Sequence, residues 1–374
     1  MTGEPTPAPR ALGRDRVGVA VVGYGYWGPN LARTVSVSDA AELTAVCDLD
    51  EARRARAAKH HPGARMTAEW DSVLEDEAVD AVALALPVPL HYRFAMEALS
   101  AGKHVLVEKP LAETVAQCDD LVREAAGRRV VLMPGHTFEF NAAVQAVGDY
   151  IDRGELGDVY YVSMRRTNLG IVRSDINAMW SLAPHDVSIL LSWLRLEPLS
   201  VTAVGVGYLQ PGIEDVVFMT IRFEGDVMGH IHASWLEPNK VRDATVVGSR
   251  KMAVYDDTSP DLKVWIYDKG IQKQEVNGQA SLGRYEDFAR FQMIARAGDV
   301  VAPKVEFREP LALQFEHFAQ CVLTGRPPRI DGESGRRVVG VLEAAQRSLD
   351  NGGTSEAIDL AAARRVAAVA SRSR

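Results

Sequence analysis

A glycine-rich motif near the start of the chain has the residue types and spacing of a dinucleotide-binding turn. Gly23, Gly25 and Gly28 form a GxGxxG pattern in GYGYWG, directly after the apolar run VGVAVVG. Between a buried strand and a helix, the first glycine makes the tight turn, the second lets the backbone approach a pyrophosphate, and the third permits close helix packing. Tyr26 and Trp27, inside the motif, are expected to contact the same nucleotide. A glycine-rich hairpin is the structural alternative.

An acidic residue follows at the position where dinucleotide-binding domains bind the ribose. Asp48 ends the next predicted strand, 20 residues after Gly28. An acid placed there hydrogen-bonds the adenosine ribose hydroxyls. A carboxylate would repel a 2′-phosphate, so the sequence favours NAD over NADP. Arg53 and Arg54 come later and are expected to lie on a solvated helix face.

A Glu–Lys pair marks a second chemical position. Glu108 and Lys109 directly follow the predicted strand 105–107. Ligands of open α/β sheets bind at the carboxyl ends of the strands. A lysine there can reach a substrate hydroxyl, and partial burial lowers the pKa of a lysine toward useful acid–base chemistry. A surface ion pair is the alternative for such a pair taken alone.

The segment WSLAPHD supplies a histidine in a helical pattern. Ser181 and His185 are four residues apart, so a helix projects both from one face. A histidine in a cleft can act as general acid–base. Asp186 either orients the imidazole or caps the start of a helix expected over 183–194. A histidine satisfied by the backbone is the alternative.

The elements that must position these groups fall into two patterns. Over the first third of the chain strands and helices alternate strictly, which predicts a doubly wound parallel sheet of the Rossmann type. The expected strands are 17–23, 42–50, 81–86, 105–107 and 130–133, and the expected helices begin at Pro29 and cover 51–60, 92–99 and 115–126.

Strands dominate the second pattern, and several of them alternate apolar and polar residues, which predicts an α+β domain with a large, mostly antiparallel open sheet. The expected strands are 159–166, 200–208, 215–223, 226–235 and 244–248, and the expected helices are 142–153, 183–194, 311–323 and 334–348. The predicted organisation is a disordered leader over 1–14, a dinucleotide-binding domain over 15–137, a substrate-binding and oligomerisation domain over 138–350, and a helical tail over 351–374.

Composition excludes several classes of function. The 374 residues carry a net charge of −8, which argues against nucleic-acid or anionic-lipid binding. Three widely spaced cysteines argue against a disulfide or zinc scaffold. Neither a signal peptide nor an apolar run of about 20 residues is evident, so a soluble cytoplasmic protein is expected. His230 and His232 share a strand face, but without a third ligand nearby no metal is expected.

Taken together, these motifs resemble the glucose–fructose oxidoreductase, inositol dehydrogenase and rhizopine-catabolism (Gfo/Idh/MocA) family. The resemblance rests on GYGYWG, CDLD, LPVPLHY, AGKHVLVEKPLA and APHD, and it extends from about Val17 to Leu349. It implies that Glu108 and Lys109 lie beside the nicotinamide ribose, with Lys109 catalytic. It also implies that Pro87 and His91 line the cofactor.

The same resemblance assigns acid–base chemistry to His185, alone or together with Lys109. Ser181 stands where many members of the family carry aspartate. That departure leaves Lys109 and His185 as the expected catalytic pair. The expected substrate-binding residues are His136, Asn141, Arg166, Asn168, Arg173 and Asp186. A solvated basic edge is the alternative for the two arginines.

Within the family, GYWGPN, GHTF, NLG with RSD, and LAPHD are most similar to the nucleotide-sugar branch. This implies NAD-dependent oxidation of a secondary hydroxyl, at C3, of a hexose such as a UDP-N-acetylglucosamine-type substrate. The alternatives are an NADPH-dependent 3-ketosugar reductase, an inositol dehydrogenase, a non-catalytic nicotinamide-binding regulator and an NAD-recycling glycosidase. The uncovered face of the second sheet predicts a homodimer or homotetramer.

Overall fold

The computed structural model describes residues 8–271, 274–276, 279–281, 295–296 and 298–360. They form two compact units. Of the described residues, the first unit contains 8–140, 308–343 and 359–360, and the second contains 141–307 and 344–358. The first boundary lies within a few residues of the predicted one. Residues 308–343, however, belong to the first unit and not to a continuous second domain over 138–350.

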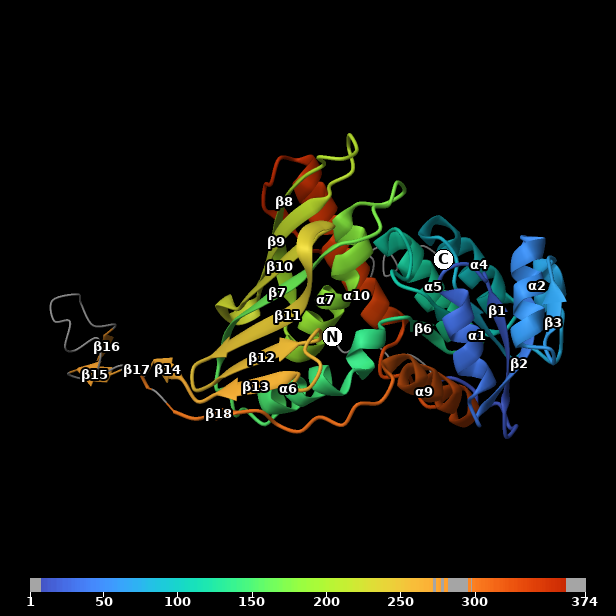
Figure 1. The fold of residues 1–374 in the computed structure, drawn as a ribbon, viewed down its shortest axis with the longest axis horizontal. Coiled ribbons are helices and arrows are strands. Elements are labelled where there is room, and N and C mark those ends of the chain that lie inside the picture. Colours follow the sequence, from blue (N-terminus) through green and yellow to red (C-terminus); the bar gives the residue numbers. More distant parts are fainter. Residues whose placement is uncertain (1–7, 272–273, 277–278, 282–294, 297, 361–374) are drawn as a thin grey trace, which may run out of the picture. The chain divides into compact units, whose positions relative to one another are not determined.

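The first unit is built on a six-stranded parallel sheet with the order β3-β2-β1-β4-β5-β6 (Figure 1). Its strands are β1 Val17–Val22, β2 Ala41–Cys47, β3 Arg65–Thr67, β4 Ala81–Leu84, β5 His104–Val107 and β6 Leu132–Pro134. Every residue of β1 is buried, as expected of a strand covered on both faces. The predicted doubly wound parallel sheet is confirmed.

Helices connect these strands and cover the sheet. They are α1 Gly28–Ser36, α2 Glu51–His60, α3 Trp70–Leu74, α4 Val88–Ser100 and α5 Val115–Arg128, followed by a 3-10 turn η1 Thr137–Phe140 and, much later, by α9 Pro310–Thr324. Capping side chains fix two of the starts. Asp50 accepts a hydrogen bond from the backbone of Arg53 at the start of α2, and Thr114 accepts one from Gln117 at the start of α5.

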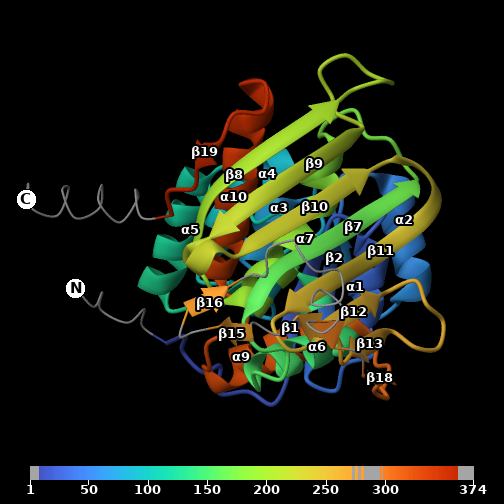
Figure 2. The same ribbon diagram turned by 90° about the vertical axis from the view of Figure 1, so that its left-hand side faces the viewer.

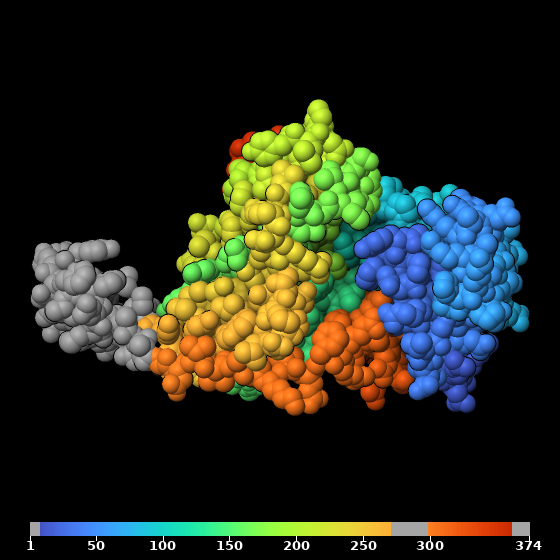
Figure 3. Space-filling model, viewed as in Figure 1, coloured from blue at the N-terminus to red at the C-terminus, as the bar shows by residue number. Residues whose placement is uncertain are grey.

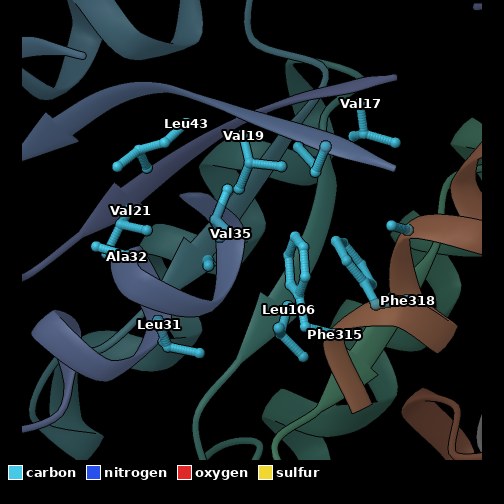
Figure 4. Close-up of a cluster of buried hydrophobic side chains, with 14 of the residues drawn as sticks. Val17, Val19, Val21, Leu31, Ala32, Val35, Leu43, Leu106, Phe315 and Phe318 are labelled. Carbon is cyan, nitrogen blue, oxygen red and sulfur yellow. The ribbon is translucent and has the colours of Figure 1, made fainter. Parts of the chain in front are cut away.

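Helix α9 explains why a late segment belongs to the first unit. Its Phe315, Phe318 and Val322 are buried in the same hydrophobic cluster as Val19 and Leu106. Figure 4 shows the two phenylalanine rings directed toward the valines of β1. Fully burying side chains of this size contributes roughly 1.5–3 kcal/mol each. The amphipathic pattern correctly predicted a helix at 311–323, but it carries no information about which sheet the helix covers.

The expected disordered leader is wrong for the part that the structure describes. Arg10 donates a backbone hydrogen bond to the carbonyl of Arg129 at 2.8 Å, and Leu12 donates one to the carbonyl of Val322 at 3.2 Å. These bonds hold residues 8–14 on the first unit. Residues 1–7 lie outside the described residues.

The second unit contains a nine-stranded sheet, counted over the described residues, with the order β18-β13-β12-β11-β7-β10-β9-β8-β19 (Figure 2). Its strands are β7 Val159–Leu169, β8 Pro198–Val206, β9 Val216–Phe223, β10 Met228–Ser234, β11 Leu236–Gly248, β12 Met252–Asp256, β13 Val264–Tyr267, β18 Val300–Val301 and β19 Glu356–Ala357. Strands β7 and β10 pair in parallel and the other pairs are antiparallel. The predicted mostly antiparallel sheet is confirmed.

Two helices cover one face of this sheet. Helix α6 (Ala142–Asp152) contacts β12 and β13, and α7 (Ala178–Leu194) contacts β7, β9 and β10. The opposite face carries half-exposed apolar side chains, and the loop between β8 and β9 projects from the surface (Figure 3). The remaining described elements are η2 Glu224–Asp226, α10 Gly332–Asp350 and the small pairs β14 Gly270–Ile271 with β17 Ala295–Arg296 and β15 Gln274–Val276 with β16 Gln279–Ser281.

The predicted helical tail over 351–374 differs from the described part of that segment. Residues 351–360 contain a turn and the short strand β19, which pairs with β8. Residues 361–374 lie outside the described residues. Within the described part of the chain, none of the helices has the length and apolar character needed to cross a membrane.

Candidate functional site

The glycine motif forms a tight turn that only glycine permits at two positions. Gly23 has φ of +90°, and a Cβ on Gly28 would lie 1.9 Å from the carbonyl oxygen of Gly23. Helix α1 starts at Gly28. Its N-cap residue is Trp27, whose side chain makes no capping hydrogen bond. A Cβ on Gly25 would meet only the guanidinium of Arg53, at 3.7 Å. A turn with open backbone at a helix N-terminus fits a pyrophosphate.

Asp48 lies at the end of β2 and is tied to this turn. One carboxylate oxygen accepts the backbone N–H of Tyr24 at 2.6 Å, and the other accepts the backbone N–H of Asp50 at 2.9 Å. Arg53 Nη1 lies 3.5 Å from the same carboxylate, and Arg54 Nη1 donates to the Asp48 carbonyl at 2.7 Å. The two arginines therefore hold the Asp48 loop. Both side chains also lie at exposed or partly exposed positions of α2, as expected.

The aromatic residues of the motif differ in exposure. Tyr26 is 84% exposed, whereas Tyr24 is buried in the core of the first unit. Trp27 is partly buried. Pro87 is exposed and precedes α4. Their contacts with a nucleotide remain predictions.

The Glu108–Lys109 pair follows β5 at the carboxyl edge of the sheet. The backbone N–H of Glu108 donates to the Leu84 carbonyl at the end of β4. Burial raises the pKa of the Glu108 carboxyl, and the neighbouring Lys109 charge partly opposes that shift. A Cβ on Gly135 would lie 3.2 Å from the Glu108 carboxylate, so glycine is the residue that fits beside it.

His136 follows Gly135 and is 1% exposed. Among the described residues, neither ring nitrogen has a hydrogen-bond partner. Burial, together with the charge of Lys109, lowers the pKa of His136 to about 3. The ring is therefore neutral near pH 7 and is a poor general base there. Its contact with a substrate remains a prediction.

His91, expected to line the cofactor, lies inside the first unit with 1% exposure. Its Nδ1 lies 2.8 Å from the Pro110 carbonyl oxygen, and its Nε2 lies 2.9 Å from the Leu86 carbonyl oxygen. The ring thus connects the loop after β4 to the loop after β5. No sequence signal beyond the position of a histidine in the first turn of α4 indicated this connection.

In the second unit, His185 lies in the interior of α7 and not in its first turn. The helix begins at Ala178, five residues before the expected start at 183, and the Asn177 side chain accepts the backbone N–H of Trp180 at 3.0 Å. Pro184 lies inside α7. His185 is partly exposed, and Ser181 precedes it by one turn of this helix.

Arg166 and Asp186 bind each other. Arg166 Nε lies 3.0 Å from both carboxylate oxygens of Asp186, and Nη2 lies 2.6 Å from one of them. The residues are 4% and 2% exposed. A buried bidentate pair fixes β7 to α7, because separating it would leave an uncompensated buried charge. Asp186 is not in the first turn of the helix, and the two residues' expected contacts with substrate remain predictions.

The other expected substrate residues occupy separate environments in the second unit. Asn141 caps α6 by accepting the N–H of Ala143, and its amide donates to Asp257 at 3.2 Å. Arg173 donates to Asp175 at 2.8 Å. Asn168 is partly buried on β7. The contacts of these residues with a substrate remain predictions.

Within the described part of the chain, no three His, Cys, Asp or Glu side chains gather as metal ligands. The His232 ring stacks on Phe218 with 4.3 Å between centroids. His230 Nδ1 lies 3.3 Å from the Thr220 hydroxyl. Packing on the sheet accounts for both histidines.

A parallel sheet with a glycine turn, an acid after β2 and a Glu–Lys pair after β5 defines a dinucleotide-binding protein of the Rossmann class. Residues 17–136 match the family model described as "oxidoreductase family, NAD-binding Rossmann fold", and residues 144–254 match the GFO/IDH/MocA C-terminal domain. The chain belongs to the Gfo/Idh/MocA family of oxidoreductases.

Three relatives act on sugars or cyclitols according to their names. Inositol 2-dehydrogenase 2 of Saccharopolyspora erythraea is 30% identical over 56% of this chain and 64% of its own. UDP-N-acetylglucosamine 3-dehydrogenase of Acidithiobacillus ferrooxidans is 26% identical over 85% of this chain and 93% of its own. dTDP-3,4-didehydro-2,6-dideoxy-alpha-D-glucose 3-reductase of Streptomyces violaceoruber is 41% identical over 33% of this chain and 35% of its own. The chain thus spans less than two thirds of two of these relatives.

A solved structure shares the fold. GenD2 from gentamicin A biosynthesis, in complex with NAD, matches with a TM-score of 0.76 and 24% identity over 94% of this chain and 99% of its own. At that identity the likeness concerns the fold.

Replacing Gly28 with alanine tests the turn. We expect Gly28→Ala to destabilise the protein by about 1–3 kcal/mol and to weaken NAD binding, because the new Cβ collides with backbone. Urea unfolding and titration of NAD would measure both effects. The control is Gly127→Ala in α5. The new Cβ would meet no described atom within 4 Å, and the substitution should raise the stability of the protein by up to about 1 kcal/mol. Equal effects of the two substitutions would contradict this account of the turn.

Proposed function

We propose that the protein is an NAD-dependent dehydrogenase that oxidises a secondary hydroxyl, at C3, of a nucleotide-linked hexose such as a UDP-N-acetylglucosamine-type substrate. The observation that carries the proposal is the Glu108–Lys109 pair at the end of β5, on the same sheet edge as the glycine turn after β1. The similarity to UDP-N-acetylglucosamine 3-dehydrogenase along 85% of the chain supports the substrate class.

The residues of the first unit fit a dinucleotide. The turn at Gly23 and the N-terminus of α1 would hold the pyrophosphate, and Asp48 would accept hydrogen bonds from the adenosine ribose. Glu108 and Lys109 would lie at the nicotinamide end. When bound, the nicotinamide supplies the hydride acceptor.

The protein's part in the reaction is to remove the proton of the substrate hydroxyl. Lys109 is the first candidate, because the buried Glu108 carboxyl beside it has a raised pKa and can exchange a proton with it near neutral pH. His185 on α7 is the second candidate. His136 is not a candidate for this step, because burial lowers the pKa of its ring to about 3 and keeps it neutral near pH 7.

A reductase of a 3-ketosugar is the second candidate function. The 41% identity to a dTDP-sugar 3-reductase over 122 residues favours it. The same lysine or histidine would then donate the proton to the carbonyl oxygen. Because such an enzyme would use NADPH, the nucleotide preference distinguishes the two functions.

Titration with NAD, NADH, NADP and NADPH should therefore come first. We expect binding of NAD(H) at least about tenfold tighter than binding of NADP(H), since the Asp48 carboxylate repels a 2′-phosphate. Asp48→Asn, which keeps an acceptor but removes the charge, should narrow that preference. Preferred binding of NADPH would favour the reductase and would point to Arg53 as the phosphate ligand. Binding of neither nucleotide would contradict both functions.

Turnover of a panel of nucleotide sugars, beginning with UDP-N-acetylglucosamine, tests the acid–base residue. Lys109→Met should lower kcat by about 10²–10⁴-fold while NAD still binds, because a positioned acid–base group contributes that much. His185→Gln on the same panel shows whether the histidine shares the role. Lys59→Met, at an exposed position of α2, is the control. Full activity of Lys109→Met would exclude the lysine as the proton acceptor.

We also propose that copies of the chain associate through the outer face of the second sheet. Val204 on β8 faces Phe218 on β9, which faces His232 on β10. Val204 and Phe218 are 50% and 42% exposed. A continuous apolar row of this kind suits an isologous contact, in which the same patch serves both subunits.

Phe218→Asp should convert the expected homodimer or homotetramer to smaller species in sedimentation velocity, because a charge on each copy would be buried in the contact. Val37→Asp, at a 69% exposed position of the first unit, should leave the assembly unchanged. A wild-type protein that sediments as a monomer at micromolar concentration would contradict the proposed association.

A further inference from the structure

His91 joins two loops at the carboxyl edge of the parallel sheet. Its Nε2 lies 2.9 Å from the carbonyl of Leu86, in the loop after β4, and its Nδ1 lies 2.8 Å from the carbonyl of Pro110, in the loop after β5. Strands β4 and β5 are neighbours, with Leu84 paired to Val107. The ring is 1% exposed, its contact with the Pro110 carbonyl is buried, and its contact with the Leu86 carbonyl is partly buried.

Each of the two loops carries a different part of the proposed site. The loop after β4 packs on the glycine turn, because a Cβ on Gly23 would lie 2.5 Å from the carbonyl oxygen of Ala85. The loop after β5 carries Lys109 immediately before Pro110. The imidazole therefore sets the distance between the segment that contacts the dinucleotide-binding turn and the segment that carries the proposed proton acceptor.

The two contacts of the ring are not equivalent for Lys109. Only the contact from Nδ1 reaches the residue next to the lysine, whereas the contact from Nε2 closes a local loop five residues back in the chain. Both partners are carbonyl oxygens, which accept only, so each bond needs a proton on the ring nitrogen. A neutral imidazole has one such proton, and burial lowers the pKa of His91 and so favours the neutral ring.

From this geometry we propose that His91 is a positioning residue whose Nδ1–H donates to the Pro110 carbonyl and thereby holds Lys109 in place for proton transfer. The inference rests on the proposed function for its catalytic consequence. Its structural content, a proton on Nδ1 that fixes the segment containing Lys109, stands independently of the substrate.

Two variants separate the two contacts. In His91→Asn the amide nitrogen takes the place of Nδ1 and can still donate to Pro110, whereas in His91→Gln it takes the place of Nε2 and can donate only to Leu86. We expect His91→Gln to lower kcat by about 10- to 100-fold and His91→Asn to stay within about threefold of the wild type, because displacements near 1 Å have effects of that size. KM for NAD should change little in either variant.

Two further measurements need no substrate. In ¹⁵N spectra of the histidine-labelled wild-type protein, Nδ1 of His91 should carry a proton. Acetylation of Lys109, measured by mass spectrometry relative to the exposed Lys59, should change several-fold in His91→Gln and remain at the wild-type rate in His91→Asn. If no sugar is oxidised or reduced, the proposed function fails, while these two readouts still decide the role of His91.

A second buried histidine provides the matched control. His104 on β5 accepts the backbone N–H of Val131 through Nδ1 and does not contact the loop of Lys109 in the described structure. His104→Asn should lower the Tm without changing kcat or the labelling of Lys109. An unprotonated Nδ1 of His91 in the wild-type protein would overturn the proposal. Equal losses of kcat in His91→Asn and His91→Gln would overturn it as well. Losses that only follow the Tm, as in the control, would also overturn it.

Discussion

The close approach of backbone at the end of β1 is the constraint on which the first unit depends. The carbonyl of Gly23 lies where a Cβ on Gly28 would be, so α1 can start only because residue 28 has no side chain. The same turn offers the N–H of Tyr24 to Asp48 and packs against Ala85. The positions of Asp48 and of the loop after β4 both follow from this contact.

The second unit depends on a buried pair of opposite charges. Arg166 and Asp186 satisfy each other in a dry interior, and their bidentate geometry fixes one rotation of α7 against β7. His185 precedes Asp186, so the direction of the candidate acid–base residue follows from the ion pair. This positional role explains why two charged residues lie in a core that is mostly apolar.

Local signals made most of the first unit predictable from the sequence. The apolar run before Gly23 adjoins the glycine motif, and Asp48 follows 20 residues after Gly28 at the end of the next strand, so this strand, turn and helix were predictable from a short stretch of sequence. The sequence patterns failed to predict features that depend on contacts between residues far apart in the chain. Helix α7 begins at Ala178, five residues before the predicted start, and the amphipathic pattern of α9 does not show which sheet the helix covers. Arg166 and Asp186, 20 residues apart, were expected to contact a substrate, and no local pattern showed that they bind each other.

The electrostatics around Lys109 narrow the chemistry of the proposed site further than its motif does. The charge of Lys109 lowers the pKa of both His91 and His136, and burial lowers them more. Both imidazoles are thus favoured in the neutral form near pH 7. The pKa of the Glu108 carboxyl shifts in the opposite direction, because burial raises it toward physiological pH. In the described first unit, the Glu108–Lys109 pair is therefore the proposed place of proton exchange at this sheet edge, while His91 contacts the backbone of the loop that carries Lys109.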